Sequence, residues 1–97
     1  MVGLCPVMSL YDLGNGQTAF ITRNYNGWDF PTSEDVPQAY RGKTFTARFG
    51  DVHGDGVLVI EPKDLGRIVL RESEIRRWTP DQRKLAEIVM KTVPKGL

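Results

Sequence analysis

The stretch KTFTARFGDVHGDGVLVIE, residues 43–61, decides the fold class. Its first seven residues alternate between polar and apolar side chains, as in a strand with one buried face. The apolar members of that alternation are Phe45, Ala47 and Phe49. Residues 50–56 contain three glycines and two aspartates, which predict a turn. The apolar run that follows, Val57 to Glu61, predicts a more fully buried strand.

The residues before this stretch predict further strands and a short helical segment. Val7 to Leu13 and Thr18 to Tyr25 flank Gly14-Asn15-Gly16, which predicts a β-hairpin. Asn26-Gly27 is a strong turn signal, so Trp28 to Phe30 is expected to return as a short third strand. Residues 32–42 begin with hydroxyls and acids and end with glycine, the order expected for one or two turns of α or 3₁₀ helix.

The C-terminal part predicts one more strand and the longest helix. Arg67 to Arg71 should pair antiparallel to residues 57–61, because the short connection leaves no room for a parallel crossover. Thr79 and Gln82 have the spacing of a capping box, so a helix is expected from Pro80 to about Thr92. Its apolar stripe consists of Leu85, Ile88, Val89 and Val93.

Together these elements predict one domain of the mostly-β or α+β class, spanning residues 1–97. A small antiparallel sheet or an SH3-like barrel would carry the C-terminal helix packed on it. The order of elements from Val57 to Trp78, with Glu74 to Trp78 as a short closing element, is similar to the second half of an SH3-like barrel. This likeness is one of shape, since it covers about a quarter of the chain and has no diagnostic motif. Residues 1–6 are expected to form a mobile N-terminus.

Composition argues against several classes of protein. The longest apolar run is four residues, Val57 to Ile60, whereas a membrane-spanning helix needs about 20. The first residues have no basic region of the kind that opens a secretory signal. The single cysteine, Cys5, cannot form an internal disulfide. A cytoplasmic protein without membrane contact is therefore expected.

No motif for catalysis or metal binding is complete. Asp51-x-His53-x-Asp55-Gly56 resembles the start of a calcium-binding EF-hand loop, but Pro62 occupies the position where that loop needs its bidentate glutamate. We therefore interpret it as a turn with a solvated histidine, and Cys5 as an inert or partly buried thiol. The glycine-rich segments lack the lysine and the following helix of phosphate-binding loops. The sequence predicts neither an enzyme nor a cofactor or metal site.

Charge and aromatic side chains suggest binding instead. Residues 1–66 carry five basic and eight acidic side chains, whereas residues 67–97 carry eight basic and four acidic ones. Such an end could meet nucleic-acid phosphates, an acidic protein or the acidic half of a second copy. The candidate binding residues are Trp28, Tyr40, Arg71, Arg76, Arg77, Trp78, Arg83 and Lys84.

Two functions are compatible with these residues. The first is a small non-catalytic binding or regulatory accessory module that contacts a protein partner or forms a homo-oligomer. The alternative is a nucleic-acid-binding domain. In that case five basic side chains would hold phosphates and Trp78 would stack on a base: Arg71, Arg76, Arg77, Arg83 and Lys84.

Overall fold

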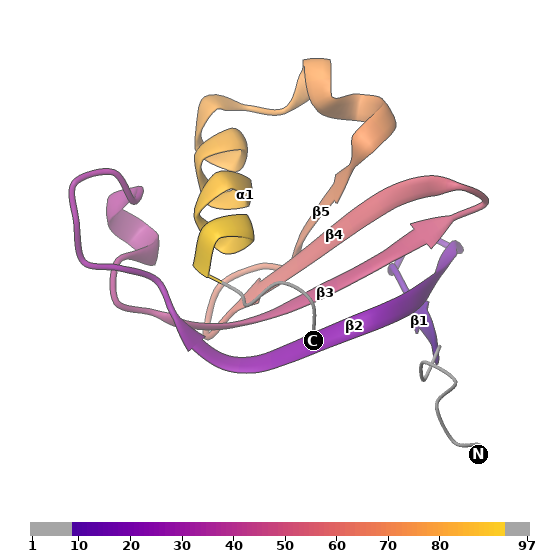
Figure 1. The fold of residues 1–97 in the computed structure, drawn as a ribbon, viewed down its shortest axis with the longest axis horizontal. Helices are drawn as coiled ribbons and strands as arrows, with labels where there is room; N and C mark the ends of the chain where they lie inside the picture. The colour runs from indigo at the N-terminus through magenta and orange to yellow at the C-terminus, as the bar shows by residue number, and fades with distance from the viewer. Residues whose placement is uncertain (1–8, 93–97) are drawn as a thin grey trace.

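The computed structural model of the chain describes residues 9–92, which form an antiparallel sheet with a helix on one face (Figure 1). The expectations for residues 1–6, Val7 and Val93 lie outside the described residues. The strands pair in chain order: β1 (Ser9–Asp12), β2 (Thr18–Asp29), β3 (Thr44–Val52), β4 (Asp55–Pro62) and β5 (Ile68–Arg71). The helices are the 3₁₀ helices η1 (Gln38–Tyr40) and η2 (Glu72–Arg77) and the α-helix α1 (Pro80–Thr92).

The predicted class is confirmed, because a five-stranded antiparallel sheet carries the C-terminal helix. A closed barrel is not confirmed. The strand order places β1 beside β2 and β5 beside β4, so the hydrogen-bonded sheet has two open edges in the described part of the chain. Within residues 9–92 no helix is long and apolar enough to cross a membrane.

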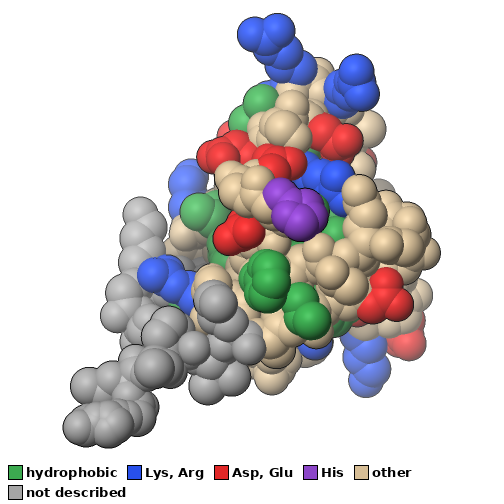
Figure 2. Space-filling view, turned by 90° about the vertical axis from the view of Figure 1, so that its right-hand side faces the viewer, with side chains coloured by type: hydrophobic (Ala, Val, Ile, Leu, Met, Phe, Trp, Pro, Cys, Tyr) green, Lys and Arg blue, Asp and Glu red, His purple; other side chains and the backbone are tan. Residues whose placement is uncertain are grey.

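The central hairpin follows the predicted alternation, with a shorter turn. Phe45 and Ala47 are buried on the expected face of β3. The turn is confined to His53 and Gly54, whose φ values of 52° and 87° suit the two-residue connection of a twisted hairpin. The prediction of a turn over all of residues 50–56 was therefore too wide, since the flanking residues continue the ladder of β3 and β4. Figure 2 shows this end of the molecule, with the histidine (purple) at the surface among acidic side chains (red).

The predicted turn at Asn26-Gly27 is wrong, and so is the separate third strand after it. β2 runs straight through this dipeptide. Tyr25 pairs with Ala47 and Trp28 with Phe45, so β2 has one residue more than β3 between these pairs, and Gly27 with φ of 78° lies in the resulting β-bulge. Pairing with β3 packs Tyr25 and Trp28 against the core, and this gain outweighs the local turn preference.

The helical segments follow their predicted signals to different extents. Residues 32–42 form only the single turn η1, which begins directly after Pro37. The capping box of α1 is complete: the Thr79 amide donates to Gln82 Oε1 at 2.9 Å and the Gln82 amide donates to Thr79 Oγ1 at 3.1 Å. Leu85, Ala86 and Val89 are the buried residues of α1. Ala86 was not part of the predicted stripe.

The sheet buries side chains on both faces, which explains why all of Val57 to Ile60 is buried. The larger core lies between the sheet and α1 and includes Phe30, Phe45, Leu70 and Leu85. The smaller core lies on the opposite face, where the β1–β2 hairpin packs against β4 through Leu13, Ala19, Ile21, Val57 and Val59. The helix therefore covers one face and the N-terminal hairpin curves over the other.

Candidate functional site

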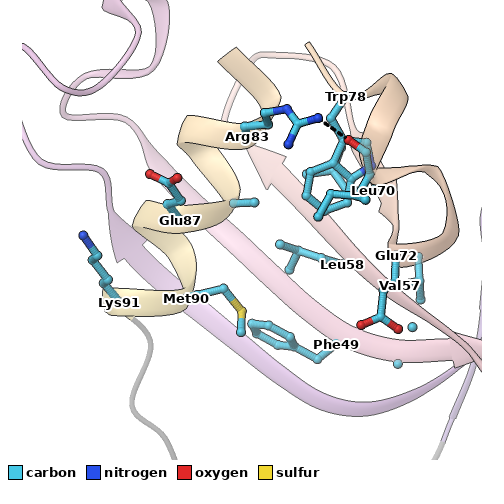
Figure 3. A pocket seen from close by; sticks show the side chains of 14 residues that line it. Phe49, Val57, Leu58, Leu70, Glu72, Trp78, Arg83, Glu87, Met90 and Lys91 are labelled. Carbon is cyan, nitrogen blue, oxygen red and sulfur yellow. Dashed lines mark hydrogen bonds between the residues drawn. The ribbon is translucent and has the colours of Figure 1, made fainter. Parts of the chain in front are cut away.

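An open groove lies between α1 and the sheet, with a volume of about 820 Å³ (Figure 3). Its floor is one cross-strand row of apolar side chains on the helix-bearing face, in which Phe49 of β3 pairs with Leu58 of β4 and Leu58 pairs with Leu70 of β5. Trp78 lies near Leu70 at one end of the groove, and Met90 lies near Phe49 at the other. The groove therefore runs alongside α1 and across the strands.

Two exposed apolar side chains form the upper walls of this groove. Met90 on α1 is 50% exposed and Ile75 on η2 is 46% exposed, and both line the groove. Large apolar side chains scattered singly over a surface are ordinary, but several facing one concavity mark a binding site. The lining is completed by Gly50, Gly56, Val57, Ala86 and four charged residues, Glu72, Arg83, Glu87 and Lys91.

Hydrogen bonds hold the wall opposite α1 in place. The carboxylate of Asp55 on β4 accepts from the Ser73 amide at 3.0 Å and from the Ser73 hydroxyl at 2.6 Å, so it ties the start of η2 to the central hairpin. At the end of η2 the Trp78 indole Nε1 donates to the Arg71 carbonyl at 3.1 Å. Arg83 Nη2 donates across the groove end to the Ile75 carbonyl at 2.7 Å. The groove is thus a built feature of the fold, with both walls anchored.

The charges along α1 leave the rim of the groove positive. Arg83, Glu87 and Lys91 follow one another at four-residue spacing along α1 and all line the groove. Glu87 already has a cationic neighbour, since its Oε1 lies 3.7 Å from Lys84 Nζ. The hydrogen bond that Arg83 makes is to a neutral carbonyl and leaves its charge uncompensated. The α1 side of the groove therefore favours negative charge, while Glu72 on the opposite wall favours positive charge.

Exposed apolar side chains continue beyond the groove onto the first two strands. Phe20 of β2 pairs with Asp51, which stands two residues beyond Phe49 on the same face of β3. Leu10 of β1 pairs with Phe20. Leu10 is 65% exposed and Phe20 is 44% exposed. By this register the two side chains form a cross-strand row that continues into Asp51, one row away from the groove floor.

Of the binding residues predicted from the sequence, Trp78 and Arg83 line the groove. Trp28 and Tyr40 are partly buried against the larger core, and the Tyr40 ring meets Phe30 edge to face. The remaining four are basic and lie apart from the groove. Together with Trp78 and Arg83 they make up the predicted nucleic-acid surface. Arg71 donates to the Gln17 side chain, and Lys84 is the ion-pair partner of Glu87. Arg76 and Arg77 are exposed on η2.

A second polar cluster lies on the opposite face of the sheet. The Tyr11 ring contacts two guanidinium groups, with Arg48 Cζ at 4.6 Å and Arg67 Cζ at 4.9 Å from its centroid. Glu61 forms ion pairs with both arginines. Arg67 also donates to the Asp12 carbonyl at 2.9 Å, which links the residue before β5 to β1. We call Tyr11, Arg48, Glu61 and Arg67 the edge clamp, because they join the two ends of the open sheet through side chains.

The edge clamp changes the acidity of its tyrosine. Burial raises the pKa of Tyr11, and the hydrogen bond to Glu61 and the negative charge of that carboxylate raise it further. The positive charges of Arg48 and Arg67 act in the opposite direction. Both arginines of the clamp share the Glu61 carboxylate and contact the Tyr11 ring, which suits a structural role better than ligand binding.

The calcium-like segment has structural uses in this fold. Asp51 Oδ1 accepts from the Gly54 amide at 3.3 Å within the turn, and Asp55 holds Ser73 as described. His53 is exposed at the tip of the turn. In the described part of the chain, no group of three or more histidine, cysteine, aspartate or glutamate side chains is arranged to hold a metal ion.

Comparison with known proteins gives no relative: no family model matches the chain, and neither a curated protein nor a solved structure matches it. The groove was also not visible in the sequence, because its floor and walls come from segments between Phe49 and Lys91. The available signal was two apolar residues at positions where an exposed polar residue would be expected. Ile75 stands between Glu74 and Arg76, and Met90 lies outside the apolar stripe predicted for α1.

Proposed function

We propose that this domain is a non-catalytic binding module that takes an apolar segment of a protein partner into the groove between α1 and the sheet. The observation that carries the proposal is the placement of exposed Met90 and Ile75 on the two walls above an apolar floor. Water in contact with these side chains would be released on binding, which favours association. The segment is supplied by another protein or by a second copy of the chain, as in a homo-oligomer.

The chemistry of the groove supports binding rather than catalysis. Its ionisable side chains are two carboxylates and two cations at the rim, and its remaining described lining residues are apolar or glycine. A general acid or base works beside a nucleophile or a polarised substrate group. Here the carboxylates, Glu72 and Glu87, come from opposite walls and are accompanied by no histidine, cysteine, serine or threonine among the lining residues.

The nucleic-acid alternative receives less support from the described contacts. Three of the basic side chains already have partners within the fold. Arg71 donates to Gln17 in the β1–β2 turn, and Arg83 donates to the Ile75 carbonyl on η2. Lys84 forms an ion pair with Glu87 on its own helix. Trp78 uses its indole NH inside the fold and is partly buried against the core. A stacking platform for bases needs an aromatic face open to solvent within a basic surface.

Site-specific photo-cross-linking tests the proposed function. A photoreactive residue replaces Met90 in the groove, and the matched control replaces Leu65, which is 36% exposed on the β4–β5 connection. Irradiation in an extract of the cells that make the protein should give adducts from position 90 that are missing from position 65. Mass spectrometry should place the cross-link on an apolar segment, and Ile75→Glu should abolish it. Equal adducts from both positions, or none from position 90, would contradict the proposal.

A further inference from the structure

We infer that the occupant of the groove is an amphipathic α-helix with acidic residues on its flanks, which lies beside α1 on the sheet. This inference rests on the proposed function and specifies its partner. The groove has the length for such a helix. The rim from Arg83 to Lys91 covers nine residues of α1, a rise of about 12 Å or slightly more than two helical turns. A partner helix would therefore place apolar residues from two to three successive turns on the floor.

The backbone of the groove favours a helix over an extended segment. A bound strand gains affinity by pairing its amide and carbonyl groups with a free sheet edge. The central floor strands, β3 and β4, are each paired on both sides, so their backbone groups are already used. An extended segment would leave its own polar backbone groups unpaired against Phe49 and Leu58, whereas a helix satisfies them internally.

The arrangement of the groove also matches the packing of helices on a sheet. α1 already lies on this face and buries Leu85 and Val89 against the sheet. The uncovered row of Phe49, Leu58 and Leu70 runs beside it, with Met90 projecting toward Phe49. A second helix would pack against Met90 on one side and the sheet below, at the spacing of about 10 Å usual for neighbouring helices. Ile75 would contact its other side.

Charge at the rim determines the flanks of the partner. Arg83 and Lys91 lie at the two ends of the α1 rim, and the acidic residue between them, Glu87, is already beside Lys84. Acidic side chains on the adjacent flank of the partner would face two cations. A basic helix of equal hydrophobicity would face the same two cations unfavourably, with Glu72 on the far wall as its main attraction. The groove therefore discriminates by charge as well as by apolar contact.

Three synthetic peptides test this inference by fluorescence anisotropy with the full chain. Each has about 14 residues, long enough for four helical turns. The acidic peptide has leucine at i, i+3, i+7 and i+10 with glutamate on both flanks, and the basic peptide replaces these glutamates with lysine. The scrambled peptide has the composition of the acidic one without a single apolar face. The acidic peptide should bind at least about tenfold more tightly than the other two at low ionic strength, with a smaller margin over the basic peptide in added salt.

Variants of the protein assign the effect to the groove. Lys91→Glu should weaken binding of the acidic peptide by about threefold and strengthen binding of the basic peptide. Lys63→Glu makes the same change of charge at the residue that follows β4. It should alter the binding of neither peptide. Met90→Glu should abolish binding of the acidic peptide, and circular dichroism should show an unchanged fold because Met90 is half exposed. Arg83→Glu provides a second rim variant with the same expected direction as Lys91→Glu.

The outcomes separate this inference from the function on which it rests. If all three peptides bind equally and Met90→Glu abolishes their binding, the groove takes apolar segments but the acidic helix is wrong. If no peptide binds, or if binding survives both Met90→Glu and Ile75→Glu, both proposals fail. Sedimentation velocity of the free protein provides a further check. A dimer that Met90→Glu dissociates would identify a second copy as the occupant and overturn the inference.

Discussion

At the scale of single residues, Gly50 shows how tightly β2 and β3 approach each other. A Cβ atom at this position would lie 2.1 Å from the Phe20 carbonyl oxygen, a backbone atom that cannot move alone. Gly50→Ala is therefore expected to lower the free energy of unfolding by at least about 2 kcal/mol. Gly66→Ala is the matched control, because nothing lies within 4 Å of its Cβ position. Urea denaturation measures both, and similar values for the two variants would contradict the close approach.

Tyr11 makes a second prediction at this scale, concerning alkaline pH. Because its pKa is raised in the folded state, the neutral phenol is favoured by folding. The resulting stabilisation is fully present below the unfolded pKa of about 10 and is lost as pH rises through the folded value. The stability difference between the wild type and Tyr11→Phe should therefore stay constant from pH 7 to about 9 and shrink above about pH 10. Urea denaturation of both proteins across this range measures it, and a constant difference up to about pH 11 would contradict the raised pKa of Tyr11.

At the scale of elements, the start of α1 depends on two reciprocal hydrogen bonds between Thr79 and Gln82. Thr79→Ala should reduce the free energy of unfolding by about 1 kcal/mol, whereas Thr79→Ser keeps the hydroxyl and should change it by only a few tenths. Gln82→Ala should add less in the Thr79→Ala background than alone, since the two residues act as one unit. Fully additive losses in denaturant unfolding would show that the capping box contributes nothing as a pair.

The elements that sequence predicted well are those fixed by neighbours in the chain. The capping box needs only residues 79–82, and the buried face of β3 needs only the alternation around Ala47. The turn predicted at Asn26-Gly27 was wrong because the favourable local turn competes with pairing to β3. The pairing partners, Ala47 and Phe45, lie about twenty residues away in the sequence. The strand therefore kept its length and accommodated the glycine as a bulge.

Most of the candidate site could not be predicted from the sequence, because it too depends on contacts between distant parts of the chain. Trp78 and Arg83 were predicted as binding residues, but the apolar floor is a row across three strands that only the register brings together. Phe49 was recognised as a core residue and proved to be partly exposed at the groove. The edge clamp is likewise a product of sheet curvature, which brings Tyr11 to Arg67 across most of the chain.

At the scale of the whole molecule, the described basic residues after residue 66 make contacts in different parts of the fold. Arg71 contacts Gln17 in the β1–β2 turn, Arg83 contacts η2 and Lys84 contacts Glu87 on its own helix, while Arg76 and Arg77 are exposed together on η2. Binding to single- or double-stranded oligonucleotides should therefore be weak, with a log-log salt slope of less than about 2. Fluorescence anisotropy over a salt series measures it. A slope of about 4 or more that Arg76→Glu/Arg77→Glu abolishes would favour the nucleic-acid function instead.

The two tryptophans give the molecule an intrinsic optical reporter. Trp78 lines the groove, and its indole NH is held by the Arg71 carbonyl, while Trp28 packs near the far end of β2 beside Phe45. In a Trp28→Phe variant the remaining tryptophan fluorescence would come from Trp78. A side chain that enters the groove would exclude the Trp78 ring from water. Occupancy of the groove would then shift the Trp78 emission to shorter wavelength, without a label on either partner. Stopped-flow fluorescence would measure the rate at which the groove is filled.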